Sequence, residues 1–168
     1  MKLRGGLILV LLLMTVGGIK ASENLASLEA MFIYNFTRLI QWPDGSTGNV
    51  FVIGVYSNDE VFDALVGYTQ NRKVGSRAIE VKRINSVEEA KTCQLLFVPN
   101  EQMAKIKEIK SSLGNHPCMV VGEKEGSNGL GATIEFVVKD NKLSFRINEG
   151  TAKSQNLLVS GALLDMGV

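Results

Sequence analysis

The chain has 168 residues, of which 18 are basic and 17 acidic, for a formal net charge of +1 at pH 7. A balance this close to neutral gives no single-sign field that would attract nucleic acid or an anionic membrane surface. One histidine and two cysteines are too few for a convincing metal site, which takes three or four ligands. We therefore expect no metal, no cofactor and no nucleic-acid partner. One basic cluster is interpreted as a solvated face: Arg72, Lys73, Arg77, Lys82 and Arg83.

Residues 1–21 have the layout of a secretory signal peptide. A short basic start precedes an apolar run over residues 5–16, and small residues follow as far as Ala21. The run is shorter than the roughly 20 apolar residues of a membrane span, which favours cleavage after Ala21 over an uncleaved anchor. Residues 22–168 then form a single secreted domain, long enough to bury a hydrophobic core.

The first predicted helix covers residues 25–40. Pro43 would stop it, because the residue before a proline is pushed out of helical angles. Apolar residues recur at spacings of three and four, as one face of a helix requires. This stripe consists of Leu25, Leu28, Phe32, Phe36, Leu39 and Ile40.

Three continuous apolar runs of strand length follow, at residues 50–56, 94–98 and 118–122. Runs without polar alternation indicate strands buried on both faces, as in a parallel sheet. A shorter strand is predicted at residues 78–81. Helices are expected between the strands, because a good capping residue precedes each intervening segment: Asp59, Ser86 and Asn100. This alternation predicts a parallel sheet with helices on both faces.

The pattern changes near the C-terminal end of the chain. A glycine-rich loop leads to two strands at residues 133–138 and 143–147, with Asp140 and Asn141 at the turn, which predicts a hairpin. A final helix is predicted over residues 151–165. The expected fold class is α/β: three αβα layers around a mostly parallel, Rossmann-like sheet, with a C-terminal antiparallel hairpin and a final helix.

The residue pattern contains no catalytic constellation. His116 lies two residues from Cys118, but a nucleophile and its base need a defined mutual geometry, and a proline separates this pair in a predicted loop. Glu123 and Glu125 follow a buried strand, where ligand crevices form in open α/β sheets, but a solvated loop is the favoured interpretation. The glycine-rich loop at 126–131 leads into a strand, whereas a phosphate-binding loop opens a helix. We expect no catalytic residues and a protein that is not an enzyme.

Cys93 and Cys118 form a candidate disulfide. Each precedes a predicted buried strand at the same end, and neighbouring strands lie roughly 4.8 Å apart, which suits the Cα separation of a disulfide. In an oxidising compartment the bond would close a loop of roughly 25 residues and contribute on the order of 3 kcal/mol. The alternative is two free thiols that fill the core as small apolar side chains.

The stretch from Phe32 to Pro43 resembles the first helix of the YfiR family of secreted, periplasmic bacterial proteins. Further segments resemble this family in the same order along nearly the whole mature chain, among them the Cys-led strand at 93–98 and the glycine-then-strand segment at 129–136. The matching positions that look structural are Phe32, Tyr34, Asn35, Phe36, Trp42, Pro43, Gly54, Gly122, Asn148 and Ser160.

The resemblance implies a role that the residues themselves do not show. Members of the family are non-enzymatic periplasmic regulators, typically homodimers, that bind an inner-membrane diguanylate cyclase and hold its activity down. An outer-membrane lipoprotein can sequester them and release the cyclase. We expect this chain to act in the periplasm in the same way, as a regulator in cyclic di-GMP signalling. Its partner-contacting residues are not among the matched positions.

Two other functions are compatible with the sequence. In the first, the domain binds a small ligand in an apolar pocket near Gly54, Pro99 and Glu123 and reports to another membrane receptor, such as a histidine kinase. In the second, it is an enzyme that uses Glu123 or His116.

Overall fold

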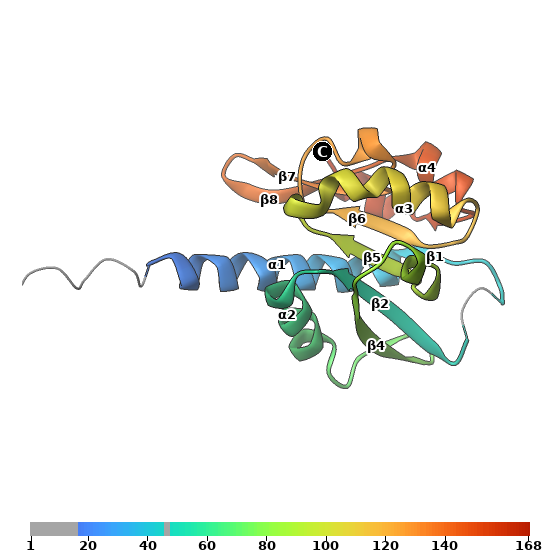
Figure 1. Ribbon diagram of the computed structural model, residues 1–168, viewed down its shortest axis with the longest axis horizontal. Coiled ribbons are helices and arrows are strands. Elements are labelled where there is room, and N and C mark those ends of the chain that lie inside the picture. Colours follow the sequence, from blue (N-terminus) through green and yellow to red (C-terminus); the bar gives the residue numbers. More distant parts are fainter. Residues whose placement is uncertain (1–16, 46–47) are drawn as a thin grey trace, which may run out of the picture.

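The computed structural model describes residues 17–45 and 48–168, so residues 1–16 of the predicted signal peptide lie outside the described residues. Its centre is a seven-stranded sheet in the order β3-β4-β2-β5-β6-β7-β8 (Figure 1). The strands are β2 (Val50–Tyr56), β3 (Lys73–Val74), β4 (Arg77–Ile84), β5 (Leu95–Val98), β6 (Met119–Gly122), β7 (Ile134–Lys139) and β8 (Lys142–Ile147). The central strands run parallel, and β3 and β8 are antiparallel edge strands. The mostly parallel sheet and the C-terminal hairpin are thus confirmed.

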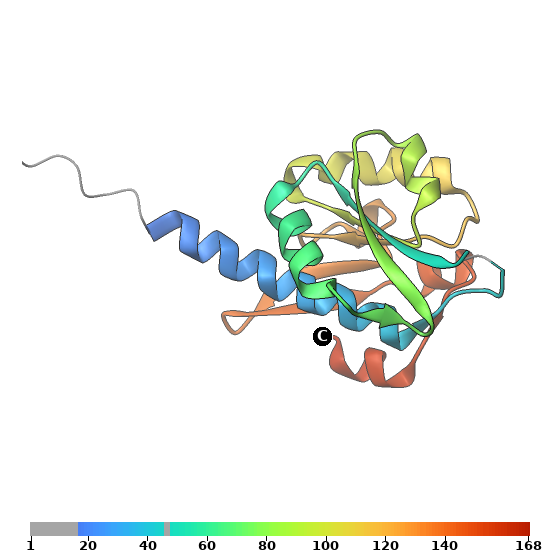
Figure 2. The same ribbon diagram turned by 90° about the horizontal axis from the view of Figure 1, so that it is seen from below.

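Helices cover both faces of the sheet and complete the three layers (Figure 2). One face carries α1 (Gly17–Leu39), α2 (Asp59–Thr69) and α5 (Gly161–Met166), and the other carries η1 (Glu88–Thr92) and α3 (Ile106–Leu113). The remaining helical turns are η2 (Asn100–Lys105), η3 (Asn128–Leu130) and α4 (Glu149–Ser154). No helix among the described residues is both long and apolar enough to cross a membrane.

The buried strands form where the apolar runs are continuous. Along β5, Leu95 and Phe97 belong to the core under α1, whereas Leu96 and Val98 belong to the core under α3. Successive side chains of a strand point to opposite faces, so a strand covered on both sides must be apolar at every position. This requirement explains why these strands were readable from the sequence.

The predicted stripe of α1 packs on the sheet at Phe32, Phe36, Leu39 and Ile40, but not at its two N-terminal leucines. Leu25 and Leu28 are 41% and 44% exposed. Because Ala26 and Ala30 are small, their side of the helix can approach the sheet closely, whereas a leucine face would hold it further away. The buried face consists of Ala26, Glu29, Ala30, Ile33, Phe36, Thr37 and Ile40. It includes one carboxyl group, that of Glu29.

The chain ends in a helix as predicted, but the helix is shorter than residues 151–165. The segment contains α4, a strand β9 (Leu158–Val159) and α5. Asn156 has a positive φ of 57°, which breaks the helix. Strand β9 then pairs with β1 (Ile40–Gln41), a two-residue strand that follows α1 directly. The same pairing ends α1 at Leu39, before Pro43 is reached.

The helix starts differ from prediction in detail. Asn58, and not Asp59, caps α2, since its Oδ1 accepts a hydrogen bond from the Val61 amide at 2.9 Å. Asn100 is the first residue of η2 and does not cap it, because Pro99 precedes it in extended conformation. Val87 takes the N-cap position of η1, and Ser86 lies one residue before it, where its Oγ accepts a hydrogen bond from the Glu89 amide at 3.4 Å.

Candidate functional site

The sheet has a topological switch point between β2 and β5. After β2 the chain crosses through α2 to β4 on one side, and it then returns through η1 to β5 on the other side of β2. Open α/β sheets bind ligands beside the carboxyl ends of strands at such a point. Glu123 follows the carboxyl end of β6 close to this position, and it was a candidate in the sequence.

Glu123 is held at this end of the sheet by the neighbouring loop. Its Oε2 accepts a hydrogen bond from the Asn100 amide at 2.6 Å. Partial burial raises the pKa of the Glu123 carboxyl, although the Asn100 hydrogen bond opposes the shift. The negative charges of Glu101 and Glu60 raise it further. The carboxyl ends of the strands are therefore an acidic environment.

Glu29 lies under the same end of the sheet and was not predicted. It is only 2% exposed, on the buried face of α1. Burial, followed by the charge of Glu123, raises the pKa of the Glu29 carboxyl to about 8. An uncompensated carboxylate in a core is costly, so Glu29 is mostly protonated at neutral pH. The sequence did contain a signal for this buried acid, since Glu29 lies on the same side of the helix as the small apolar residues Ala26 and Ala30.

The remaining acidic and histidine candidates do not assemble into a catalytic site. Glu125 forms an ion pair with Arg146, whereas Glu123 bonds to the chain after β5. The buried Nε2 of His116 has no hydrogen-bond partner among the described residues. Burial raises the pKa of the Cys118 thiol well above its usual range, which is the reverse of what a nucleophilic thiolate needs. The described residues also contain no group of three or more potential ligands that could hold a metal ion.

The glycine-rich loop is occupied by a side chain of the protein itself. The amides of Gly126 and Asn128 donate to Glu135 Oε2 at 2.8 and 3.0 Å. Glu135 is 4% exposed, and the Arg146 guanidinium lies 3.6 Å from its other oxygen. An internal carboxylate thus takes the place that a bound phosphate would have in such a loop. The sequence interpretation of this segment as a structural turn fits these contacts.

Cys93 and Cys118 are free, buried thiols in this structure. They precede β5 and β6, which are neighbouring strands as expected, and both side chains belong to the core under α3. The charge of Cys93 would also raise the pKa of Cys118, so the two thiols lie near one another. The disulfide itself is absent here and stays a prediction for the oxidised protein.

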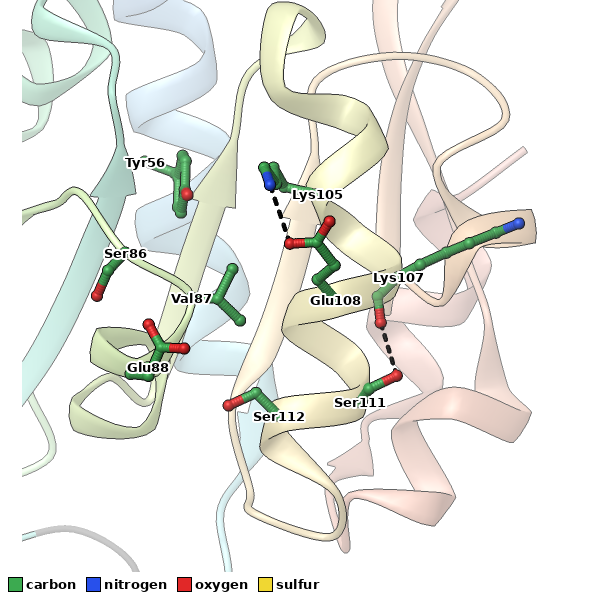
Figure 3. Close-up of a pocket in the computed structure, with 9 residues that line it drawn as sticks. All are labelled: Tyr56, Ser86, Val87, Glu88, Lys105, Lys107, Glu108, Ser111 and Ser112. Atoms are coloured by element: carbon green, nitrogen blue, oxygen red, sulfur yellow. Dashed lines mark hydrogen bonds and ion pairs between the residues drawn. The ribbon is translucent and has the colours of Figure 1, made fainter.

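Two hollows among the described residues lie away from the predicted ligand pocket. The first, of about 680 Å³, lies between η1 and α3 and is lined by residues such as Tyr56, Val87 and Glu108 (Figure 3). The second, of about 890 Å³, lies at the end of α1. Neither is lined by Gly54, Pro99 or Glu123. At Gly54 an added Cβ would lie 2.6 Å from Cys93 Sγ, so the sheet is tightly packed there.

A comparison with protein families decides what the chain is related to. The YfiR/HmsC-like family matches residues 26–168. The chain belongs to this family. A comparison with curated proteins found no match.

Several positions that carry the resemblance to YfiR proteins lie in aromatic contacts. Phe32 and Phe36 pack against both rings of the hairpin, Phe136 and Phe145, at centroid distances of 4.9 to 6.0 Å. The Trp42 ring meets Phe51 edge to face at 4.9 Å. The first helix and the stretch that follows it are thereby fixed to the sheet.

Most of the polar residues at positions that resemble the YfiR family either cap a helix or join two segments through a hydrogen bond. Trp42 Nε1 donates to the Gln94 carbonyl at 3.0 Å, next to Pro43. Asn148 caps α4 and Ser160 caps α5. Asn35 is half-buried and forms no side-chain hydrogen bond with any residue of the described part of the chain.

Two more positions that resemble the YfiR family are glycines, and the absence of a side chain there lets neighbouring side chains pack against the backbone. A Cβ on Gly122 would lie 2.3 Å from the Ser127 side chain, and one on Gly54 would lie 2.8 Å from Ile84 Cγ1. The Tyr34 hydroxyl donates to the Lys73 carbonyl at 3.4 Å, and the Tyr34 ring lies at the wall of the second hollow.

Proposed function

We propose that the protein is a periplasmic regulator that binds and restrains an inner-membrane signalling protein, most specifically a diguanylate cyclase, without catalysing a reaction. The family match over residues 26–168 carries this proposal. The buried thiols and the occupied glycine-rich loop agree with it, since both are used for structure. The protein would act as a homodimer, and an outer-membrane lipoprotein would sequester it.

The first test is the cyclic di-GMP level in cells. Deleting the gene should raise this level, and restoring the full gene should return it to normal. A gene that lacks the codons for residues 2–21 should fail to restore it, because the product would stay in the cytoplasm. An unchanged level after deletion, or full restoration by the leaderless gene, would contradict the proposal.

A second test separates a regulator from an enzyme. His116→Ala and Glu123→Gln remove the two groups that an enzyme would use, and a non-enzymatic regulator should tolerate both. Each variant is expected to restore the cyclic di-GMP level as the wild type does, once its thermal midpoint shows that it is folded. Loss of restoration by a folded variant of either kind would favour an enzyme.

Direct binding then identifies the partner. The purified mature domain should bind the periplasmic portion of the cyclase, and light scattering should report a dimer. If the cyclase does not bind, the same experiment with the periplasmic portions of histidine kinases tests the alternative receptor.

A further inference from the structure

The second hollow lies at the end of the sheet opposite to the acidic carboxyl ends. Its walls come from the last turn of α1, from β3 and from the first residue of β4. We call it the basic hollow and define it by Tyr34, Arg38, Trp42, Lys73 and Arg77, which line it. These elements are far apart in the sequence and meet only because β3 folds back on β4 beside α1.

Three cations of the basic hollow have no acidic partner among the described residues. Arg38, Lys73 and Arg77 form no ion pair with any acidic side chain that the structure describes. Other cations of the protein do form such pairs, for example Arg83 with Asp59 at 2.9 Å and Lys105 with Glu108 at 2.9 Å. Asp44 is the one acid that lines the hollow, so its wall carries a net positive charge. Cations gathered in this way repel one another unless an anion joins them.

The wall of the basic hollow is held by contacts that do not involve a ligand. The Tyr34 side chain is tied to Lys73 through its hydroxyl, and Trp42 is tied to Gln94. A fourth cation, Arg72, stacks over the Tyr34 ring at 5.1 Å and over Tyr68 at 4.4 Å, and it therefore supports the wall. A cavity formed in advance saves a ligand the free energy of ordering it.

We propose that the basic hollow binds a small organic anion that carries two or more acidic groups. The volume of about 890 Å³ falls within the range of small-molecule sites, and three cations from three different elements can contact separate acidic groups. Phosphate and carboxylate groups share this chemistry, and the experiment below distinguishes them. This inference does not rest on the proposed function, so its failure would leave that function untouched.

The protein contains its own reporter for the test. Trp42 is the only tryptophan of the chain and lines the basic hollow, so its fluorescence should respond to an occupant. The full mature domain is titrated with pyrophosphate, with tricarballylate and with acetate. We expect saturable binding with a Kd below about 1 mM for at least one of the two polyvalent anions, and much weaker binding of acetate. The stronger of the two identifies the preferred acidic group.

Matched variants locate the site. Lys73→Gln and Arg77→Gln should each weaken binding about tenfold, because each removes one charge-assisted contact. Lys107→Gln is the control, since Lys107 is also an exposed lysine, and Figure 3 shows its side chain directed away from the other hollow. It should bind as the wild type does. Raising the ionic strength from about 0.05 M to about 0.5 M should weaken the wild type and change Lys73→Gln less.

Three results would overturn the proposal. The first is the absence of saturable binding of either polyvalent anion. The second is equal weakening by Lys73→Gln and by Lys107→Gln. The third comes from a parallel titration with an acidic peptide: binding of the peptide alone, with no small anion bound, would make the hollow a contact for a protein.

Discussion

The carboxyl group of Glu29 lies within electrostatic reach of Glu123, although Glu29 belongs to α1 and Glu123 follows β6. Burial is the larger cause of the high Glu29 pKa, and the Glu123 charge adds to it. We therefore expect the packing of α1 against the sheet to depend on pH.

Stability should fall as the pH rises because of Glu29. Its pKa is about 8 in the folded protein against an ordinary value of 4.5, so between these values the folded state holds more protons than the unfolded state. The free energy of unfolding should therefore decrease from about pH 5 to about pH 8, by at most about 1.4 kcal/mol per pH unit. Urea unfolding followed by Trp42 fluorescence measures this slope.

Glu29→Gln should flatten that pH profile and raise stability at about pH 8, because an amide carries no charge to bury. Glu149→Gln is the control, since Glu149 is exposed and its charge contributes to the pKa shift of neither Glu29 nor Glu123, so the slope should stay unchanged. A smaller slope should remain in Glu29→Gln, because the pKa of Glu123 is also raised. Parallel profiles for the wild type and Glu29→Gln would contradict the assignment.

Gly54→Ala and Gly67→Ala should have opposite effects on stability. An added Cβ at Gly54 would lie 2.6 Å from Cys93 Sγ, so the substitution should cost about 1–3 kcal/mol of unfolding free energy. Gly67 is exposed in α2 with nothing within 4 Å, so an alanine there should add up to about 1 kcal/mol through its helix propensity. Chemical denaturation of the two variants provides the comparison, and a tolerated Gly54→Ala would disprove the tight contact.

Gln155 should be required for stability although it resembles a surface residue in the sequence. It is fully buried, its Nε2 donates to the Cys118 carbonyl at 2.6 Å, and its Oε1 accepts from Thr133 Oγ1 at 2.9 Å. Gln155→Leu would remove the donor to the Cys118 carbonyl and the acceptor for the Thr133 hydroxyl hydrogen, and should cost about 1–3 kcal/mol or more. The exposed Gln70→Leu should stay within about 0.5 kcal/mol of the wild type. Equal midpoints for the two variants would remove the role assigned to Gln155.

The thiols should be inert in the reduced, folded protein. Burial is the largest cause that raises the pKa of Cys93, to about 11, and it raises that of Cys118 as well, so few thiolates form at about pH 8. Ellman's reagent should react slowly with the native protein and rapidly after unfolding in urea. Rapid reaction of the native protein would show that the α3 face opens readily.

Export should decide whether the candidate disulfide forms. Protein purified from the periplasm is expected to resist alkylation even after unfolding, because Cys93 and Cys118 would be bonded. Protein kept in the cytoplasm should take up two alkyl groups under the same conditions. Intact mass spectrometry measures both, and two alkyl groups on the exported protein would exclude the bond.

The sequence predicted those elements whose burial is uniform. Strands β2, β5 and β6 lie between two helical layers and are apolar at nearly every position, so their sequences could be interpreted only as strands buried on both faces. The face of α1 has two interpretations, because both a leucine-rich face and an alanine face recur at helical spacing. The close approach to the sheet decides between them, and it depends on residues distant in the sequence. Glu29 was therefore missed.

The basic hollow could not be predicted from the sequence either, because it also depends on residues that are distant in the chain. Lys73 and Arg77 were interpreted as part of a solvated face, and Arg38 is an ordinary residue of a helix end. Only the pairing of β3 with β4 beside α1 brings the three together. A site whose residues come from three separate elements leaves no spacing pattern in the sequence.

The small sheet formed by β1 and β9 determines the order in which the molecule can be completed. Ile40 pairs with Val159, and the Ser160 amide donates to the Leu39 carbonyl at 3.0 Å. Contacts between such distant positions have a high contact order, and they form late because a long loop must close first. The C-terminal end of α1 can therefore become ordered only after the segment around Leu158 has been synthesised. A chain truncated before Leu158 should collapse, but the end of its first helix should not pack in a fixed position.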